Sequence, residues 1–384
     1  MRRLLLALIV LLAVPTAARA DTVVSLGDSA ISGEAGRWAG NTNQSSSKTD
    51  ALGPTAYFDN ANGTGEAIPG CHRSKSAEVH IGGGVTSVNL ACSGARTYSR
   101  VSDSNFKPGI DFYNSGGNKG QALALQELAG RDKGIKAVVV LIGANNYGFA
   151  DIVQTCVTDW LTSPSWWKNY CQDDSNITAM FTQSNINTIT TQVRGAFQNV
   201  RNAMLAGGYA DGTYKILAQT YSAPIPKSAG FRYGETGFTR QTVGGCGVWN
   251  KDANWARDTV VTTLNNTVRN AVAGMANVQV LNMDEALAGR KLCENTVGLL
   301  EERGISTWRS AGAVDNSEWV QQIRTLTTLF PPYQLQEDAH PNYWGQLALR
   351  NCFRQAYNGG AVRGGTCSRG TGLNGNGEPN MTLG

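Results

Sequence analysis

Several patterns that define common function classes are missing from this 384-residue chain. Only three histidines are present and no two cysteines have C-x2-C spacing, which excludes a zinc-finger type of metal site. No G-x-S-x-G sequence occurs, which argues against the nucleophile elbow of the α/β-hydrolases. No internal repeat and no low-complexity linker divides the chain, so the sequence favours a single domain.

Long hydrophobic runs are also scarce. The first one follows Arg2 and Arg3 and ends in small residues at Ala18 and Ala20, which is the pattern of a cleaved secretory signal. This run is shorter than the roughly 20 residues that a membrane-spanning helix needs. We therefore predict that residues 1–20 are a signal peptide, that the mature protein is secreted and extracellular, and that it has no transmembrane segment.

Blocks of positive charge are absent from the predicted mature chain. Without residues 1–20, 30 basic residues remain against 29 acidic ones. Binding to nucleic acid or to an anionic membrane therefore has little electrostatic support. The remaining 364 residues can bury a sizeable core. We expect a monomer that binds no nucleic acid and uses no metal and no cofactor.

Eight cysteines in an exported chain indicate disulfides rather than redox chemistry. They fall into four couples that are close in sequence: Cys71 with Cys92, Cys156 with Cys171, Cys246 with Cys293, and Cys352 with Cys367. This local pairing is our prediction among the 105 pairings that eight cysteines allow. Each closure would restrict the unfolded chain by about 3 kcal/mol in the entropic model.

Apolar, β-branched runs alternate with helical periods along the chain. The spacing predicts helices over 183–206 and about 251–275. Five apolar runs predict buried parallel strands, at 22–28, 85–91, 136–143, 214–221 and 278–283. This alternation predicts an α/β fold with three α/β/α layers around a doubly wound parallel sheet.

Three long stretches do not follow the alternation: 32–80, 151–180 and 223–249. Because cysteines occur in or next to them, we expect ordered loop insertions tied by disulfides. The last stretch, 369–384, has no apolar period and predicts a flexible tail. One domain is therefore expected over 21–368.

Polar residues follow three of the predicted strands, at the edge where open parallel sheets bind ligands. Ser29 lies in "GDS" after the first strand, Gly94 in "NLACSGA" after the second, and Asn145 in "LIGANNYG" after the third. Ester hydrolysis needs such a set, because a serine nucleophile must lose its proton and the oxyanion needs hydrogen-bond donors. Asp28, beside the serine, is expected to brace the turn.

A histidine is the usual base for such a serine. His340 is the best candidate, because Glu337 and Asp338 lie three and two residues before it and could orient the ring. His72 and His80 are interpreted as loop histidines without a ligand role.

The sequence motifs around Ser29, Gly94, Asn145 and His340, called here the first to fourth blocks, resemble those of the SGNH hydrolases, also called GDSL esterases and lipases. The resemblance holds for their order and extends across nearly the whole mature chain. The likeness is strongest to the secreted, disulfide-containing bacterial members. The resemblance implies a flavodoxin-like fold, a nucleophile at Ser29 and a base at His340. It also implies an oxyanion hole made by the Ser29 and Gly94 amides and the Asn145 side chain.

The chain departs from the family pattern at the acid. Glu337 stands where the family normally has an aspartate, and Asp338 is a possible alternative acid. Some relatives orient the ring with a backbone carbonyl instead. Either way we predict a secreted serine esterase or lipase that forms an acyl-enzyme from a small-molecule or lipid ester. An acyltransferase with the same site is one alternative, and a secreted binding protein that keeps the fold without turnover is another. For Ser29 alone, a role as the N-cap of the next helix is the alternative.

Overall fold

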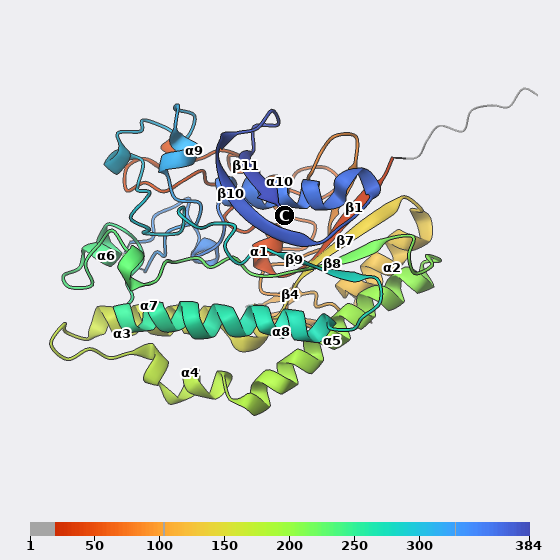
Figure 1. Cartoon of the computed structure of the whole chain (residues 1–384), viewed down its shortest axis with the longest axis horizontal. Coiled ribbons are helices and arrows are strands. Elements are labelled where there is room, and N and C mark those ends of the chain that lie inside the picture. The colour runs from red at the N-terminus through yellow and green to blue at the C-terminus, as the bar shows by residue number, and fades with distance from the viewer. Residues whose placement is uncertain (1–19, 103, 327) are drawn as a thin grey trace, which may run out of the picture.

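A seven-stranded sheet forms around the apolar runs of the sequence. A computed structural model describes residues 20–102, 104–326 and 328–384, and its strands lie in the order β11–β10–β9–β8–β7–β1–β2 (Figure 1). The predicted strands are found at β1 (Thr22–Gly27), β2 (Thr86–Asn89), β7 (Ile135–Leu141), β8 (Lys215–Gln219) and β9 (Val278–Asn282). These five pair in parallel, which confirms the predicted parallel sheet. The predicted signal peptide lies outside the described residues, apart from Ala20.

Helices cover both faces of the sheet, as a doubly wound fold requires. One face carries α2 (Gln121–Arg131), α5 (Gln183–Ala206) and α8 (Thr262–Val272) (Figure 1). The other carries α1 (Ser29–Ser32) and α10 (Tyr343–Tyr357). The helix predicted over 251–275 is divided into α7 (Asn250–Trp255), a π-helical turn η5 (Ala256–Val261) and α8. The predicted three-layer α/β/α architecture is therefore confirmed.

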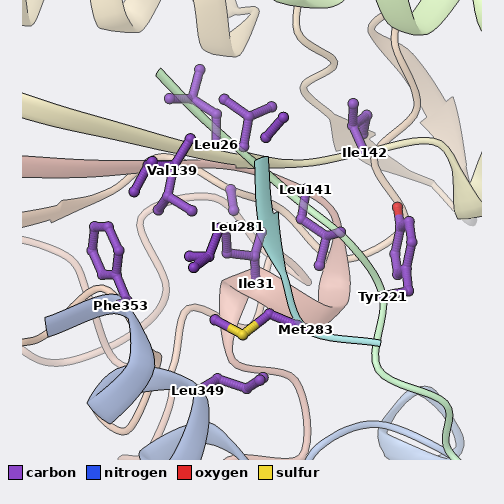
Figure 2. Packing of buried hydrophobic residues seen from close by; sticks show 14 of the residues in the cluster. Leu26, Ile31, Val139, Leu141, Ile142, Tyr221, Leu281, Met283, Leu349 and Phe353 are labelled. Atoms are coloured by element: carbon purple, nitrogen blue, oxygen red, sulfur yellow. The ribbon is translucent and has the colours of Figure 1, made fainter. Parts of the chain in front are cut away.

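The core lies between the sheet and its helices. Ile31 of α1 and Leu349 and Phe353 of α10 lie together on one side of the strands (Figure 2). All three are buried, as are the inward side chains of the central strands. Among the described residues, no helix is both long and apolar enough to cross a membrane.

Shorter elements fill the insertions between the strands. The helices are α3 (Phe149–Thr162), α4 (Ser175–Met180), α6 (Thr239–Thr242) and α9 (Ala313–Asn316). Two small ribbons pair β3 (Arg100–Ser102) with β4 (Asn105–Lys107) and β5 (Asn114–Ser115) with β6 (Asn118–Lys119). Single turns are η1 (Ser46–Lys48), η2 (Ala144–Tyr147), η3 (Cys171–Asp173), η4 (Ser228–Gly230), η6 (Glu301–Arg303), η7 (Leu335–Glu337) and η8 (Asn358–Gly360).

Four disulfides tie these insertions down. They join the four couples predicted from their closeness in sequence: Cys71–Cys92, Cys156–Cys171, Cys246–Cys293 and Cys352–Cys367.

The C-terminal stretch 369–384 is not the flexible tail predicted from its composition. It contributes most of β10 (Gly365–Leu373) and all of β11 (Pro379–Leu383), which extend the sheet beyond β9. Ladder hydrogen bonds, the disulfide to Cys367 and the burial of Met381 hold this hairpin in place. The prediction was wrong because the apolar residues of β11 alternate over only five positions, and the rest of the hairpin is held by backbone pairing that leaves no apolar pattern in the sequence.

Candidate active site

The turn after β1 presents Ser29 at the carboxyl edge of the sheet. Gly27 has a φ of 139°, and a Cβ at this position would lie 1.9 Å from the Leu141 carbonyl oxygen, so the turn requires glycine. Asp28 is the N-cap of α1, and its carboxylate accepts a hydrogen bond from the Ala30 amide. Because Asp28 does the capping, the Ser29 hydroxyl is not needed for that role.

Ser29 and His340 meet across 311 residues of sequence. The His340 Nε2 lies 2.6 Å from the Ser29 Oγ, and its Nδ1 lies 2.9 Å from the backbone carbonyl oxygen of Asp338. A carbonyl only accepts hydrogen bonds, so we assign the ring proton to Nδ1. Nε2 is then the acceptor for the Ser29 hydroxyl proton, which is the geometry of a nucleophile beside its base.

Glu337, the acid predicted from the sequence, does not contact the His340 ring. Its carboxylate accepts hydrogen bonds from Trp38 Nε1 at 2.8 Å and from the Tyr57 hydroxyl at 2.7 Å. The Glu337 carboxylate also accepts a hydrogen bond, at 3.0 Å, from the backbone amide of Gln334, the N-cap of the turn η7. The structure thus corrects this prediction: the ring is oriented by the main chain.

Asp338, the alternative acid, does not orient the ring with its side chain either. One carboxylate oxygen accepts a hydrogen bond from the Arg324 amide at 2.9 Å. Only its backbone carbonyl reaches the His340 Nδ1. Of the three arrangements left open by the sequence, the backbone carbonyl is the one that the structure contains.

Burial sets the protonation of this loop. It lowers the pKa of His340 below its ordinary value of 6.5, so the ring is neutral at pH 7 and can accept a proton. It raises the pKa of Glu337 to about 7 and that of Asp338 to about 8. Neither carboxyl group is therefore a fully ionised partner for an imidazolium at neutral pH.

A hydrogen bond joins the second and third sequence blocks, those of Gly94 and Asn145, beside Ser29 and His340. Asn145 lies on η2, and its side-chain amide donates to the Ala95 carbonyl oxygen at 2.9 Å, next to Gly94. The amide has a second N–H available for a ligand. Gly94 has a φ of 75°, which favours glycine. A pocket of 50 Å³ is lined by Ser29, Asn145 and His340, whereas Gly94 is not part of its lining.

A tyrosine that the sequence reading missed connects the first block to the third. The Tyr221 hydroxyl donates to the Asp28 carboxylate and accepts from the Ala144 amide at 3.0 Å. Burial raises the pKa of Asp28 to about 7. The expected bracing role of Asp28 therefore extends from its own turn to the one that carries Asn145. Tyr221 follows β8, so its place at a strand end was the available signal.

His72 was interpreted as a loop histidine, but it is buried beside the site. Its Nδ1 lies 2.7 Å from the carboxylate of the fully buried Glu34, and its ring stacks on Tyr57. Burial alone would lower the pKa of His72, but Glu34 outweighs it and raises the value to about 9. Burial would raise the pKa of Glu34, but His72 and His340 hold it below its ordinary value. The site thus contains a buried ion pair.

The sequence did hold a signal for this pair. His72 adjoins Cys71 and Ser93 adjoins Cys92, so the predicted disulfide between these cysteines brings the histidine to the second block. His80, the other loop histidine, is half-buried, and burial lowers its pKa to about 4. In the described part of the chain, no group of three or more His, Cys, Asp or Glu side chains is arranged to hold a metal ion.

The architecture is the one that the resemblance to SGNH hydrolases implies. Comparison with solved structures finds an extracellular lipase from Streptomyces rimosus at 18% identity and a TM-score of 0.44, covering 88% of this chain and 100% of that one. A phospholipase A1 from Streptomyces albidoflavus NA297 has 18% identity and a TM-score of 0.45, covering 89% and 100%. A family two carbohydrate esterase from Clostridium thermocellum has 11% identity and a TM-score of 0.36, covering 88% and 64%.

No family model matches the chain, and no curated protein does.

Proposed function

We propose that this protein hydrolyses carboxylic esters through an acyl-enzyme on Ser29. The observation that carries the proposal is the 2.6 Å contact between the Ser29 hydroxyl and the His340 Nε2, with the ring held from behind by the Asp338 carbonyl. A neutral imidazole in this position can remove the hydroxyl proton as the oxygen attacks.

The reaction has two halves. Ser29 Oγ bonds to the ester carbonyl carbon while its proton passes to His340 Nε2, and the resulting oxyanion is stabilised by the Ser29 and Gly94 amides and the Asn145 side chain. The imidazolium then gives this proton to the departing alcohol. In the second half His340 Nε2 takes a proton from water while the water oxygen bonds to the acyl carbon. The bond from this carbon to Ser29 Oγ then breaks, the imidazolium returns the proton to Oγ, and the carboxylic acid leaves.

Replacing the nucleophile tests this proposal. Ser29→Ala should reduce kcat toward nitrophenyl esters by at least about a thousandfold, because nucleophile and base act as a unit. Ser47→Ala, at an exposed serine of η1, is the matched control and should keep full activity. Near-normal turnover by a folded Ser29→Ala protein would end the assignment. An alcohol acceptor added to the same assay would reveal an acyltransferase as a new ester product.

We also propose that the protein is secreted. Disulfides persist mainly in oxidising compartments, and four of them stabilise this chain. Expression of the full-length chain, followed by N-terminal sequencing of the protein in the medium, tests this. A mature N-terminus at Asp21 is expected, whereas retention of residues 1–20 would contradict it.

A further inference from the structure

An apolar groove of 650 Å³ leads away from the catalytic pair along α3. One wall is a single face of this helix, which contains Phe149, Val153, Val157 and Leu161 at intervals of one turn. The other wall is the loop that precedes His340. Eight of its 15 lining residues are apolar, and apolar side chains of this kind bind hydrocarbon.

The groove is continuous with the site. His340 lines both the groove and the pocket that contains Ser29. Phe149 lines both as well, together with a side hollow of 70 Å³ whose surface is wholly apolar. A ligand that reacts at Ser29 can therefore extend into the groove past these two residues.

The titratable side chains of the groove are engaged within the protein. Besides His340, only Arg324 and Asp338 among its described lining residues are titratable. The Arg324 guanidinium lies 3.8 Å from the centre of the Tyr333 ring and donates to the Gln322 side chain at 3.0 Å. Asp338 is engaged by the Arg324 amide. These side chains are thus held by contacts within the protein, and only the buried Arg324 Nε and Asp338 Oδ1 atoms lack a hydrogen-bond partner among the described residues. Hydrocarbon can enter the groove without breaking any of these contacts.

Exposed leucines border the groove. Leu326 is 82% exposed, Leu335 is 43% exposed and Leu161 is 36% exposed, and all three belong to its lining. Exposed apolar side chains that gather around a concave surface are typical of a binding site, whereas singly scattered ones are not.

The length of the helical wall sets the size of the ligand. From Phe149 to Leu161 the helix rises about 18 Å, at 1.5 Å per residue. An extended alkyl chain advances about 1.3 Å per carbon, given C–C bonds of about 1.5 Å. Roughly 14 carbons therefore fit along the wall.

We propose that this groove binds the acyl chain of the substrate and makes the protein specific for long-chain fatty acyl esters. The proposal rests on the ester hydrolysis proposed above, to which it adds the substrate class. Long unbranched hydrocarbon in natural esters is usually the acyl part, whereas the alcohol parts are commonly polar.

A series of nitrophenyl esters from acetyl to hexadecanoyl tests the proposal on the whole protein. The value of kcat/KM should rise with acyl length, by up to about fourfold for each methylene that enters the groove, and should level off near 14 carbons. A profile that is flat or falls beyond four carbons would overturn the proposal.

Tryptophan substitutions that block the groove at two different points can show where the acyl chain of the substrate lies. Ala150 and Thr158 are both exposed, line the groove and lie about 12 Å apart along α3. The acyl length at which kcat/KM levels off should therefore be about nine carbons shorter for Ala150→Trp than for Thr158→Trp. Thr191→Trp, at an exposed threonine of α5, is the matched control and should leave the profile unchanged. Equal profiles for all three variants would also overturn the proposal.

Two further results separate the possible failures. For a parallel series of alkyl acetates, from ethyl to tetradecyl, kcat/KM should depend little on the length of the alcohol. If kcat/KM instead rises with alcohol length and the tryptophan variants change this rise, the groove binds the alcohol and the acyl assignment is wrong. Ser29→Ala should abolish hydrolysis of the acetyl ester. If it does so while the acyl profile is flat, only the groove assignment fails, whereas unchanged acetyl turnover removes both proposals.

Discussion

Two regions meet at His340 and differ in what they bury. On the side of the β1–α1 turn, Glu34, His72 and Glu337 are buried polar groups with hydrogen-bond partners in the protein. On the side of α3, Phe149 and Val157 line a groove whose exposed border is formed by leucines. The polar region can hold and tune the catalytic pair, and the apolar region can exchange water for hydrocarbon without breaking internal hydrogen bonds.

The comparison can be tested by changing one region while following the properties of the other. Changes in the polar region should alter folding stability, kcat and pH dependence for every substrate. Changes in the groove should alter only the response to long substrates. The five predictions below run from the largest expected effect to the smallest.

The largest effect is expected for His72→Gln, which leaves the Glu34 carboxylate buried without its cation. The free energy of unfolding should fall by about 3 kcal/mol at neutral pH, since removing one partner of a buried ion pair is strongly destabilising. Urea unfolding monitored by circular dichroism measures this. His80→Gln, which changes a half-buried histidine outside the pair, should cost less. An unchanged unfolding midpoint for His72→Gln would show that the pair adds no stability.

The same variant should also flatten the pH dependence of stability. The pKa of His72 in the folded protein, about 9, is above its ordinary value of 6.5, so the folded state binds more protons between these values. The stability contributed by His72 is therefore complete below pH 6.5 and is lost as the pH rises through 9. The wild type should lose more stability than His72→Gln across this window. Parallel curves would contradict the ion-pair interpretation.

Next in size is Glu34→Gln, which should reduce kcat roughly ten- to a hundredfold, because a neighbouring charge stabilises the imidazolium by a few kcal/mol at most. The charge of Glu34 raises the pKa of His340 against the effect of burial. Without it, the acid limb of kcat/KM should move to lower pH. Glu66→Gln, at a carboxylate 3.5 Å from the Nε2 atom of His72, is the control and should leave this limb in place. A loss of activity without a shift of the limb would indicate a purely structural role.

A smaller effect is expected when the carboxyl groups near His340 are neutralised. Glu337→Gln and Asp338→Asn should each lower kcat less than about tenfold, because the Asp338 backbone carbonyl orients the ring and survives both changes. Steady-state kinetics on the acetyl ester tests this. A loss of about ten-thousandfold for either variant would restore that carboxylate as a catalytic acid.

The fold was largely predictable because the sheet leaves a strong pattern. The apolar runs of β1, β7 and β8 are continuous, and the helix expected over 183–206 is found at those bounds. The hairpin at 369–384 was missed because its apolar alternation, at Pro379, Met381 and Leu383, covers only five residues and follows a run rich in glycine and asparagine, whereas backbone ladders and a disulfide hold the rest.

The site was predictable only where a residue's place in the topology decides its role. The ends of β1 and β7 place Ser29 and Asn145 at one edge of the sheet, and the loop before α10 places His340 beside them. Whether the Glu337 carboxylate or the main chain orients the His340 ring depends on the direction of the Glu337 side chain. That side chain turns to Trp38, almost three hundred residues earlier, and no spacing near position 337 indicates it.

The smallest effect, and the sharpest test of the two regions, is expected for Leu326→Ser at the border of the groove. Leu326 is 82% exposed, so its loss should change the free energy of unfolding by no more than about 0.5 kcal/mol. KM for a dodecanoyl ester should nevertheless rise a few-fold, while kinetics on the acetyl ester and the pH profile stay unchanged. Val101→Ser, at a valine that is 70% exposed and outside the groove, is the control. Because the polar region is untouched, any change in the pH profile of Leu326→Ser would mean that the two regions are coupled and that groove occupancy acts on His340.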